Sequence, residues 1–311
     1  AFEHIAAVQA ATHALVDART ERAVDDAVER LIVNDDLKLR FLNLVAEVDR
    51  LFKAILPDPR AAEFRPRYDL LAYLGDKVRR LTPAVHLPDL QREVTELLDE
   101  AIVARRYVIR EDASVYDLSK VDYEALREQF ATGRKRTEAE RLRRTIALKL
   151  REMIRRNRAR VDYQWEFQRL IDAYNRGSAN VDELFNQLID LAQRLEEEEK
   201  RHIRENLSEE ELAIFDILTR PGPDLTEDEE GQVKEITRDL LATLKDELLA
   251  LDWKKRQRYR AAVRLAIGDM LFDRLPEGYS AELCEQKRDD LYSHVYRNYA
   301  GAGASVYAGA A

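Results

Sequence analysis

The sequence predicts an all-α protein, built as an irregular multi-helix array of two to three packed helical subdomains. Leu, Ala, Glu and Arg dominate the chain, and these residues are good helix formers. The 311 residues include only 10 Gly and 8 Pro, so few positions interrupt a helix. Apolar residues recur at helical spacing along almost the whole chain. Charged residues make up 36% of it, which favours helices with long solvent-facing sides.

Residues 1–105 are expected to form an N-terminal helical subdomain. Asn34 is suited to cap a helix, because its side chain can accept a hydrogen bond from a free backbone N–H of the first turn. Pro57 and Pro59 are expected to end that helix. The same apolar spacing predicts further helices over residues 68–81 and 89–105.

The helical periodicity breaks at residues 106–120, where Tyr, Val, Ile, Asp and Ser are frequent. We expect an irregular connection there, with at most a short extended segment near residues 106–118. A central helical subdomain is predicted over residues 121–207. It includes helices over 138–157 and 162–175, each with an apolar stripe at helical spacing.

Cap signals define the helix ends in the second half of the chain. Gly177 is placed to end a helix in the left-handed conformation, and Asn180 has the type and position to start the next. A C-terminal helical subdomain is predicted over residues 208–299. Within it, Ser208 and Thr226 are each followed three positions later by Glu, which is the spacing of a capping box.

The end of the chain changes in composition. Ser280 is expected to start the last helix. Residues 300–311 are rich in Gly and Ala and predict a flexible tail. The first residue is not Met, so we expect a piece of a longer protein.

Composition indicates a reducing compartment and no membrane. Cys284 is the single cysteine, which excludes a disulfide framework within the chain and a zinc site built from several thiolates. The first residues lack the basic and continuous apolar regions of a signal peptide. No apolar run approaches the roughly 18–20 residues that span a bilayer. We therefore expect a cytoplasmic protein.

Catalytic and metal-binding patterns are missing. The sequence has no phosphate-binding glycine loop, and none of its five His forms a metal-ligand pair at helical spacing. Two fragments, Glu198–Lys200 and Glu285–Lys287, match the E-x-K pattern of metal-dependent nucleases. Both lie in helical sequence, where the spacing would splay the groups that must converge on Mg²⁺. We expect no catalytic residue, no bound metal and no cofactor in this chain.

The strongest charge feature is the helix predicted around residues 134–160. It holds twelve Arg or Lys and three Glu, a local charge of +9, whereas the whole chain carries −9. Two explanations are open. The cations either pair with the acidic segments 196–199 and 205–211, or they contact a partner protein or the phosphates of duplex DNA. The candidate contact residues, which recur at spacings of three, four and seven, are Arg141, Arg144, Arg151, Arg155 and Arg158.

A second basic cluster, over residues 253–260, is expected to begin the next-to-last helix. One explanation is an amphipathic helix with Trp253 and Tyr259 in the core and its cations in water. The other is a docking edge in which the aromatic residues anchor a partner and the cations orient it. The candidate contacts are Trp253, Lys254, Lys255, Arg256 and Arg258.

Several segments, taken in order, resemble the C-terminal helical region of the R subunit of type I restriction endonucleases. They are LFKAILPDP (51–59), DLLAYLGDKVRRL (69–81), YDLSKVDYEALREQF (116–130) with the basic helix after it, and LDWKKRQRYRAAVRLAIGDMLFDRLPEGYSAELCEQKRDDLYSHVYRNY (251–299). The resemblance covers nearly the whole chain up to Tyr299.

The resemblance implies a role in assembly. In that family the R subunit also carries a nuclease domain and two ATP-hydrolysing motor domains, which need ATP and Mg²⁺. The motifs of those domains do not occur here, so no catalytic residue is carried over. The helical region is expected to connect its own motor domains to the methyltransferase and specificity subunits. The alternative is a DNA-contacting module that uses the Arg-rich face of residues 134–160.

Overall fold

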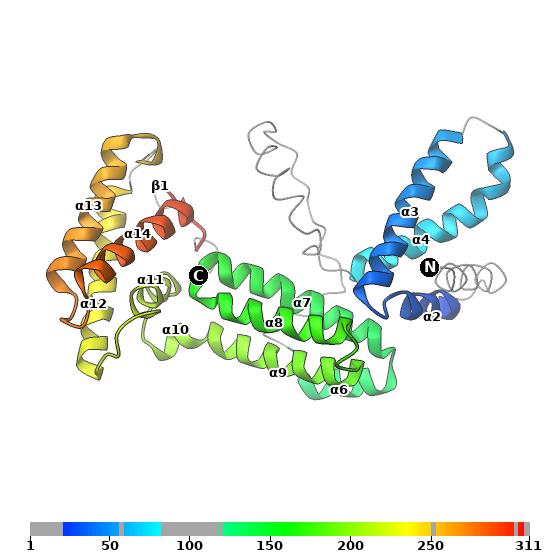
Figure 1. Ribbon diagram of the computed structural model, residues 1–311, viewed down its shortest axis with the longest axis horizontal. Coiled ribbons are helices and arrows are strands. Elements are labelled where there is room, and N and C mark those ends of the chain that lie inside the picture. The colour runs from blue at the N-terminus through cyan, green and yellow to red at the C-terminus, as the bar shows by residue number, and fades with distance from the viewer. Residues whose placement is uncertain are drawn as a thin grey trace. The chain divides into compact units, whose positions relative to one another are not determined.

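A computed structural model describes residues 21–55, 59–81, 118, 121–249, 253–301 and 304–307. The all-α prediction is confirmed, because the described chain is helical except for turns and one short hairpin near its end (Figure 1). The chain divides into two compact units. Unit 1 comprises Ala1–Lys149 and Glu166–Gln193, and unit 2 comprises Leu150–Trp165 and Arg194–Ala311. The divisions fall inside helices α7, α8 and α9.

The described part of unit 1 begins with the helices α2 (Glu21–Leu31), α3 (Asp35–Ile55) and α4 (Arg65–Leu81), with the 3₁₀-helix η1 (Pro59–Phe64) before α4. Their apolar sides share one core, which includes Val28, Leu31, Phe41, Val45, Leu74 and Val78. Asn34 caps α3 as predicted, since its side-chain oxygen accepts a hydrogen bond from the N–H of Leu37 at 2.8 Å.

A glycine sets how closely α3 and α4 approach. A Cβ atom at Gly75 would lie 2.8 Å from Cγ1 of Val45. Real Cβ atoms do not come this near to another carbon, so the packing of the two helices depends on the missing side chain.

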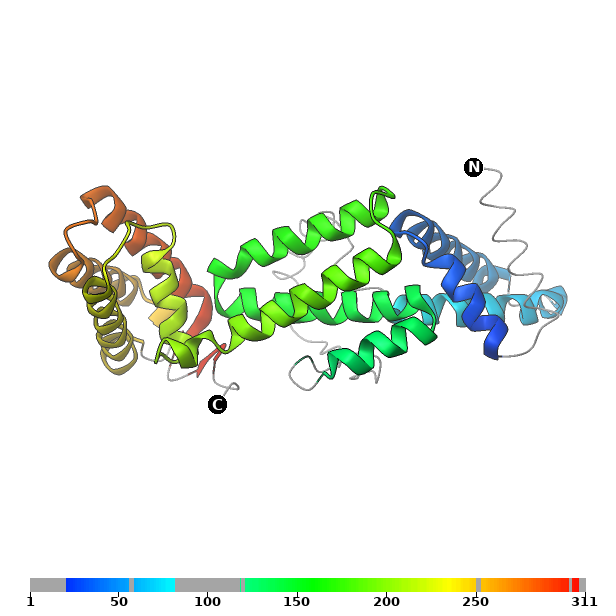
Figure 2. The same cartoon turned by 90° about the horizontal axis from the view of Figure 1, so that it is seen from below.

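The rest of unit 1 comes from α6 (Tyr123–Thr132) and parts of α7 (Lys135–Arg156), α8 (Val161–Asn175) and α9 (Val181–Glu199). Figure 2 shows these helices running side by side. The rings of Phe130 and Phe185 stack with centroids 3.7 Å apart, which joins α6 to α9. Buried apolar residues of this core include Leu142, Ile146, Ile171, Leu184, Leu188 and Ile189.

Unit 2 contains α10 (Arg201–Arg204), α11 (Glu209–Thr219), α12 (Glu227–Thr243), the π-helix η4 (Leu244–Leu248), the 3₁₀-helix η5 (Trp253–Lys255), α13 (Gln257–Arg274) and α14 (Ala281–Asn298). The short 3₁₀-helix η3 (Arg158–Arg160) also lies in this unit. Trp253 is fully buried, and its indole N–H donates to the carbonyl of Tyr299 at 3.3 Å. The core includes Leu212, Leu218, Ile236, Leu240, Val263, Ile267, Leu271, Leu291 and Val295.

A small antiparallel hairpin ends the described chain, where the sequence predicted a flexible tail over 300–311. Strand β1 (Tyr299–Gly301) pairs with β2 (Ala304–Ser305). Tyr307 follows and is buried in the core of unit 2. A single large aromatic residue therefore holds this segment against the helices, although the composition around it is that of a linker.

The predicted cap signals are confirmed. Ser208 and Thr226 each form a complete capping box with the Glu three positions later. Gly177 has a φ of +73°, the left-handed conformation that ends α8. Asn180 accepts hydrogen bonds from two N–H groups of the first turn of α9. Ser280 caps α14.

Other sequence expectations stay predictions. The helix expected over 89–105 and the extended segment near 106–118 lie outside the described residues, apart from position 118. The subdomain boundaries near 105, 120 and 207 also stay predictions. The two compact units are divided at other positions, after Lys149, Trp165 and Gln193.

Candidate interaction surfaces

A buried cluster of charged side chains joins α3, α7 and α8 in unit 1. The guanidinium of Arg143, only 1% exposed, donates to both carboxylate oxygens of Asp35 at 2.8 and 2.7 Å and to Glu140 at 3.1 Å. The Lys38 ammonium bridges Asp35 and Glu140, at 2.8 Å to each. Asn175 donates to the Asp35 carboxylate and accepts from its backbone N–H. The two cations and two anions cancel, so this cluster is a structural unit.

The pKa of Asp35 reflects these contacts. Burial alone would raise that pKa. The hydrogen bonds and positive charges of Arg143 and Lys38 outweigh burial and hold it well below its usual range. The carboxylate therefore stays ionised and fully engaged, which makes it unsuited to act as a general base.

Carboxylates of α2 hold the beginning of α7. Glu29 accepts from the backbone N–H groups of Arg136 and Thr137 at 2.6 and 3.0 Å, and from the Thr137 hydroxyl at 2.7 Å. It thus caps α7 from another helix. Arg134, just before α7, pairs with Asp26 at 3.0 Å. This end of the basic helix is bound within unit 1.

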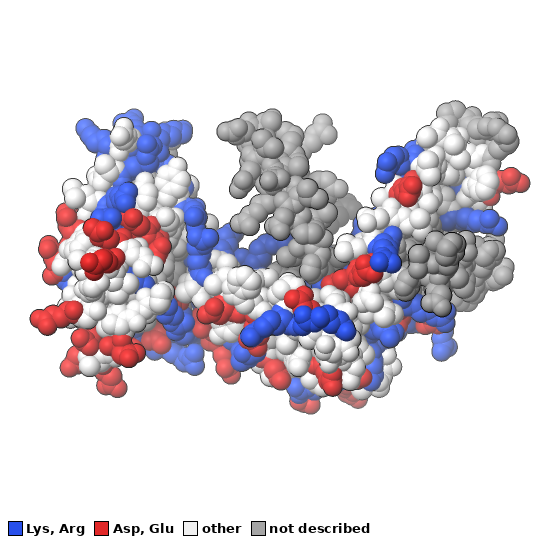
Figure 3. All heavy atoms as spheres, in the orientation of Figure 1, with Lys and Arg blue, Asp and Glu red and all other residues white. Residues whose placement is uncertain are grey.

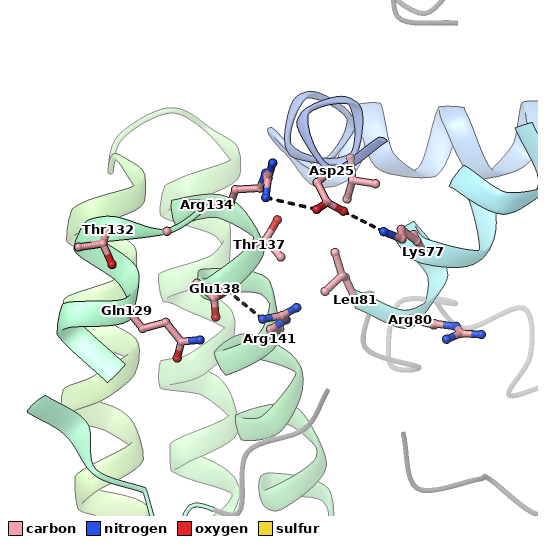
Figure 4. A pocket seen from close by; sticks show the side chains of 12 residues that line it. Asp25, Lys77, Arg80, Leu81, Gln129, Thr132, Arg134, Thr137, Glu138 and Arg141 are labelled. Carbon is pink, nitrogen blue, oxygen red and sulfur yellow. Dashed lines mark hydrogen bonds and ion pairs between the residues drawn. The ribbon is translucent and has the colours of Figure 1, made fainter. Parts of the chain in front are cut away.

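A cavity of about 460 Å³ lies in unit 1, lined by residues of α2, α4, α6 and α7 (Figure 4). Its cations already have carboxylate partners. Asp25 pairs with Lys77 at 2.8 Å and with Arg134 at 3.3 Å, and Glu138 pairs with Arg141 at 2.9 Å. The wall therefore offers little uncompensated charge to a ligand.

In unit 2 the end of the basic region meets the acidic segments that the sequence suggested. Arg160 is buried and donates to Glu198 at 3.1 Å and to Glu209. Arg201 also donates to Glu198, at 3.0 Å, and to the fully buried Asp216. Burial opposes the charge of both arginines, yet the contacts with these carboxylates raise the pKa of each above its ordinary value. The internal-pairing explanation thus holds for Arg160.

The five arginines singled out on the basic helix have different surroundings. Arg141 pairs with Glu138 of its own helix, and Arg144 also has an interaction partner. The other three are Arg151, Arg155 and Arg158. All three are exposed, and within the described part of the chain their side chains make no ion pair or hydrogen bond. Arg143 and Arg160, by contrast, are buried and paired with carboxylates.

In the second basic cluster Trp253 lies in the core, Lys254 is half-buried, and the other candidate cations are exposed. Trp253 is buried, as the amphipathic explanation requires, so it does not anchor a partner. Lys254 lies 5.2 Å from the ring centre of Tyr296. Arg256 and Arg258 are exposed and lie over the ring of Tyr259, at 5.9 and 5.3 Å. Lys255 is exposed and has an interaction partner.

The outer side of α3 carries an apolar stripe that composition did not single out as a surface. Leu44, Leu51 and Ile55 are 42%, 60% and 45% exposed. Val48 is half-buried between them. Spacings of four, three and four place these residues on one helical face, where large apolar side chains are costly unless a partner covers them.

The nuclease-like fragments have structural roles in part. Glu198 pairs with Arg160 and Arg201. Lys287 is buried and donates to the carbonyl of Ile217 at 2.6 Å, near the end of α11. Glu285–Lys287 lies within α14, as expected, whereas Glu198–Lys200 lies at the end of α9 with Lys200 in the turn before α10. No group of three or more His, Cys, Asp or Glu suited to a metal ion occurs among the described residues.

His294 lies in a buried polar group with Asn298 and Tyr307. Tyr307 donates its hydroxyl hydrogen to the carbonyl of Arg156, so its oxygen accepts from Nε2 of His294 at 3.2 Å. Nδ1 then accepts from the side-chain amide of Asn298 at 2.9 Å. Burial lowers the pKa of His294 to about 4, which keeps the imidazole neutral. These hydrogen bonds connect the end of the described chain to α7 and α14. In the sequence, the signal for this contact is Tyr307, a single large aromatic residue in a Gly/Ala-rich segment.

Comparison with known proteins decides the family. The family model described as "Type I restriction enzyme HindI endonuclease subunit-like, C-terminal" matches residues 5–297. The chain belongs to this family. The resemblance found in the sequence is therefore confirmed.

A curated relative agrees with this family. The "Putative type I restriction enzyme MjaIXP endonuclease subunit" of Methanocaldococcus jannaschii is 22% identical over 292 residues. The match covers 88% of this chain and 27% of the relative, so the chain spans about a quarter of that protein's length. No solved structure gives a significant match. Among the described helices, none has the length and apolar character needed to cross a bilayer.

Proposed function

We propose that this chain is the helical assembly region of a type I restriction endonuclease subunit. It docks that subunit, with its nuclease and ATP-driven motor domains, onto the methyltransferase and specificity subunits. It performs no catalysis itself, and ATP and Mg²⁺ act elsewhere in the full-length subunit.

The exposed apolar stripe on α3 is the observation that carries this proposal. Leu44, Leu51 and Ile55 present their side chains to solvent on a helix whose other side is well packed. Burying such residues between proteins contributes about 25 cal/mol for each Å² of apolar surface removed from water. A helix face of this kind suits a groove of another protein.

The buried carboxylates support a non-catalytic role. Asp35, Glu140, Glu198 and Asp216 all accept from Arg or Lys side chains. Each of these carboxylates is occupied by its cationic partner inside the fold. These groups stabilise helix packing and leave no free acid–base pair among themselves.

Co-purification with the methyltransferase and specificity subunits of the same restriction system tests the docking role. Removing residues 251–299 would also remove core residues of unit 2, so point substitutions are sharper. We expect L51E/I55E to lose co-purification. The matched control L265E/F272E changes exposed apolar residues on α13 and should retain it. Equal retention by both variants would contradict the proposal for α3.

A second candidate function is contact with duplex DNA through Arg151, Arg155 and Arg158. Their exposure, without a carboxylate partner in the described chain, favours it. R151Q/R155Q/R158Q should keep its fold and weaken DNA binding at low salt. Circular dichroism and fluorescence anisotropy with labelled duplex would measure the two effects. Unchanged DNA binding would remove this candidate.

A further inference from the structure

We propose that a basic segment at the start of α13 binds the phosphate backbone of duplex DNA. The segment consists of Lys254 and Lys255 of η5, Arg256 just before α13, and Arg258 in the first turn of α13. This surface lies in unit 2 and does not depend on the docking role of α3.

The density of like charge is the first reason. Residues 253–260 contain five Lys or Arg and no Asp or Glu. Figure 3 shows Lys and Arg gathered at the upper end of unit 2, where α13 begins, with Asp and Glu lower on the same unit. The nearest exposed acids in the described sequence are Asp246 and Glu247, in η4. Such a concentration of positive charge fits a partner with closely repeated negative charges.

The pairing state of the arginines is the second reason. Two arginines further along α13 have acidic partners: Arg264 pairs with Asp289 at 2.8 Å, and Arg274 pairs with Asp239 at 2.7 Å. Arg256 and Arg258 have no carboxylate partner among the described residues. The side chains of Arg264 and Arg274 are therefore neutralised by carboxylates, whereas those of Arg256 and Arg258 have no such neutralising partner among the described residues.

The aromatic contacts determine what kind of nucleic acid fits. Arg256 and Arg258 lie over the Tyr259 ring, and Lys254 lies over Tyr296. Cations on these ring faces compete with bases for stacking, and base stacking is what strengthens single-strand binding. The ring holds each guanidinium through its flat face, which leaves the N–H edges for phosphate oxygens. These cations therefore suit contact with the phosphate backbone of a duplex, independent of its base sequence.

Binding of a labelled duplex of about 30 base pairs, measured by fluorescence anisotropy from about 50 to about 200 mM salt, tests this assignment. R256Q/R258Q should weaken binding and reduce the slope of log K against log salt by about 2, because two phosphate contacts are lost. R256K/R258K keeps both charges and should retain most of the binding. R264Q/R274Q removes the same charge from the same helix and should keep the wild-type slope.

Three outcomes would overturn the proposal. In the first, R256Q/R258Q binds the duplex as tightly as wild type. In the second, R264Q/R274Q loses as much binding as R256Q/R258Q, which would indicate a general effect of net charge. Alternatively, R256Q/R258Q keeps DNA binding and loses the methyltransferase and specificity subunits, which would assign the surface to an acidic protein. The DNA measurement does not involve Leu51 or Ile55, so its failure is separate from failure of the docking role.

Discussion

Arg143 of α7 and Asp35 of α3 form a bidentate ion pair inside unit 1. Nη1 of Arg143 donates to Oδ1 of Asp35 at 2.8 Å, and Nη2 donates to Oδ2 at 2.7 Å. The two residues are 108 positions apart in the sequence. Lys38 and Glu140 complete the pair's surroundings, so no charge in the cluster is left uncompensated. The most buried arginine of the basic helix therefore serves the fold.

Removing one partner of this pair should destabilise unit 1 strongly. Asp35→Asn leaves a buried guanidinium undercompensated and should lower the free energy of unfolding by about 3–5 kcal/mol. Asp36→Asn, in the exposed pair with Arg40, should change it by less than about 1 kcal/mol. Urea unfolding followed by circular dichroism measures both. Similar values for the two variants would show that the buried pair contributes little.

The same pair predicts a dependence on acid. The folded pKa of Asp35 lies below its unfolded value of about 3.9, so its stabilising contribution is complete above that value. The contribution is lost as the pH falls below about 4 toward the folded pKa. The stability difference between wild type and Asp35→Asn should therefore shrink below pH about 4. A constant difference down to pH about 2 would argue against this assignment.

His294 predicts a second pH dependence, over a higher range. Its pKa is about 4 in the folded protein and about 6.5 when unfolded, so the unfolded chain binds more protons between these values. Stability then falls as the pH drops through this range, by roughly 2 kcal/mol between pH 7 and pH 5. His294→Gln should lose this component. Urea unfolding at the two pH values measures it, and an equal loss in both proteins would contradict the prediction.

Tyr307→Phe tests whether the end of the chain is held by its hydroxyl group. The substitution leaves the carbonyl of Arg156 and Nε2 of His294 without their partner and should cost about 1–3 kcal/mol. Tyr296→Phe removes a hydroxyl from a more exposed ring and should change stability by less than about 0.5 kcal/mol. Thermal unfolding of the two variants compares them. A neutral Tyr307→Phe would mean that ring burial alone holds the segment.

Two glycines should respond to alanine in opposite directions. Gly75→Ala places a Cβ against Val45 between α3 and α4 and should destabilise unit 1 by about 1–3 kcal/mol. Gly231→Ala, in α12, meets no atom within 4 Å and should stabilise unit 2 by about 0.5–1 kcal/mol, because alanine favours helix. Hydrogen exchange of the two units resolves the changes. Stabilisation by both would show that α3 and α4 separate easily.

The helices and their ends could be predicted from sequence because they depend on nearby residues. Ser208 and Thr226 cap their helices through contacts three positions away, and Gly177 needs only its own backbone conformation. The candidate surfaces were less predictable. Helical spacing made both Arg141 and Arg151 candidate contact residues. In the structure, the side chain of Arg141 pairs with a carboxylate of its own helix, whereas that of Arg151 has no partner in the described chain. Charge spacing on one helix does not say which acids face it.

Two residues illustrate what was missed and why. Asp216 stands among apolar residues of α11, and a carboxylate in that position signals a buried cation partner. Tyr307 follows a Gly/Ala-rich stretch that predicts a tail, but its ring finds a place in the core of unit 2. Both roles depend on residues of other elements. Asp216 contacts Arg201 and Asn157, and Tyr307 contacts Arg156 and His294.

The sequence by itself determined the all-α class, the main helix ends and the family, because helix periodicity, caps and motif order are properties of neighbouring residues. The tertiary structure decided which cations are occupied and which are available. Arg143 and Arg160 are bound inside the fold, whereas Arg151 and Arg256 face solvent. The reason is physical: an ion pair forms where packing brings opposite charges within a few ångströms and removes water, and that proximity is set by the whole fold.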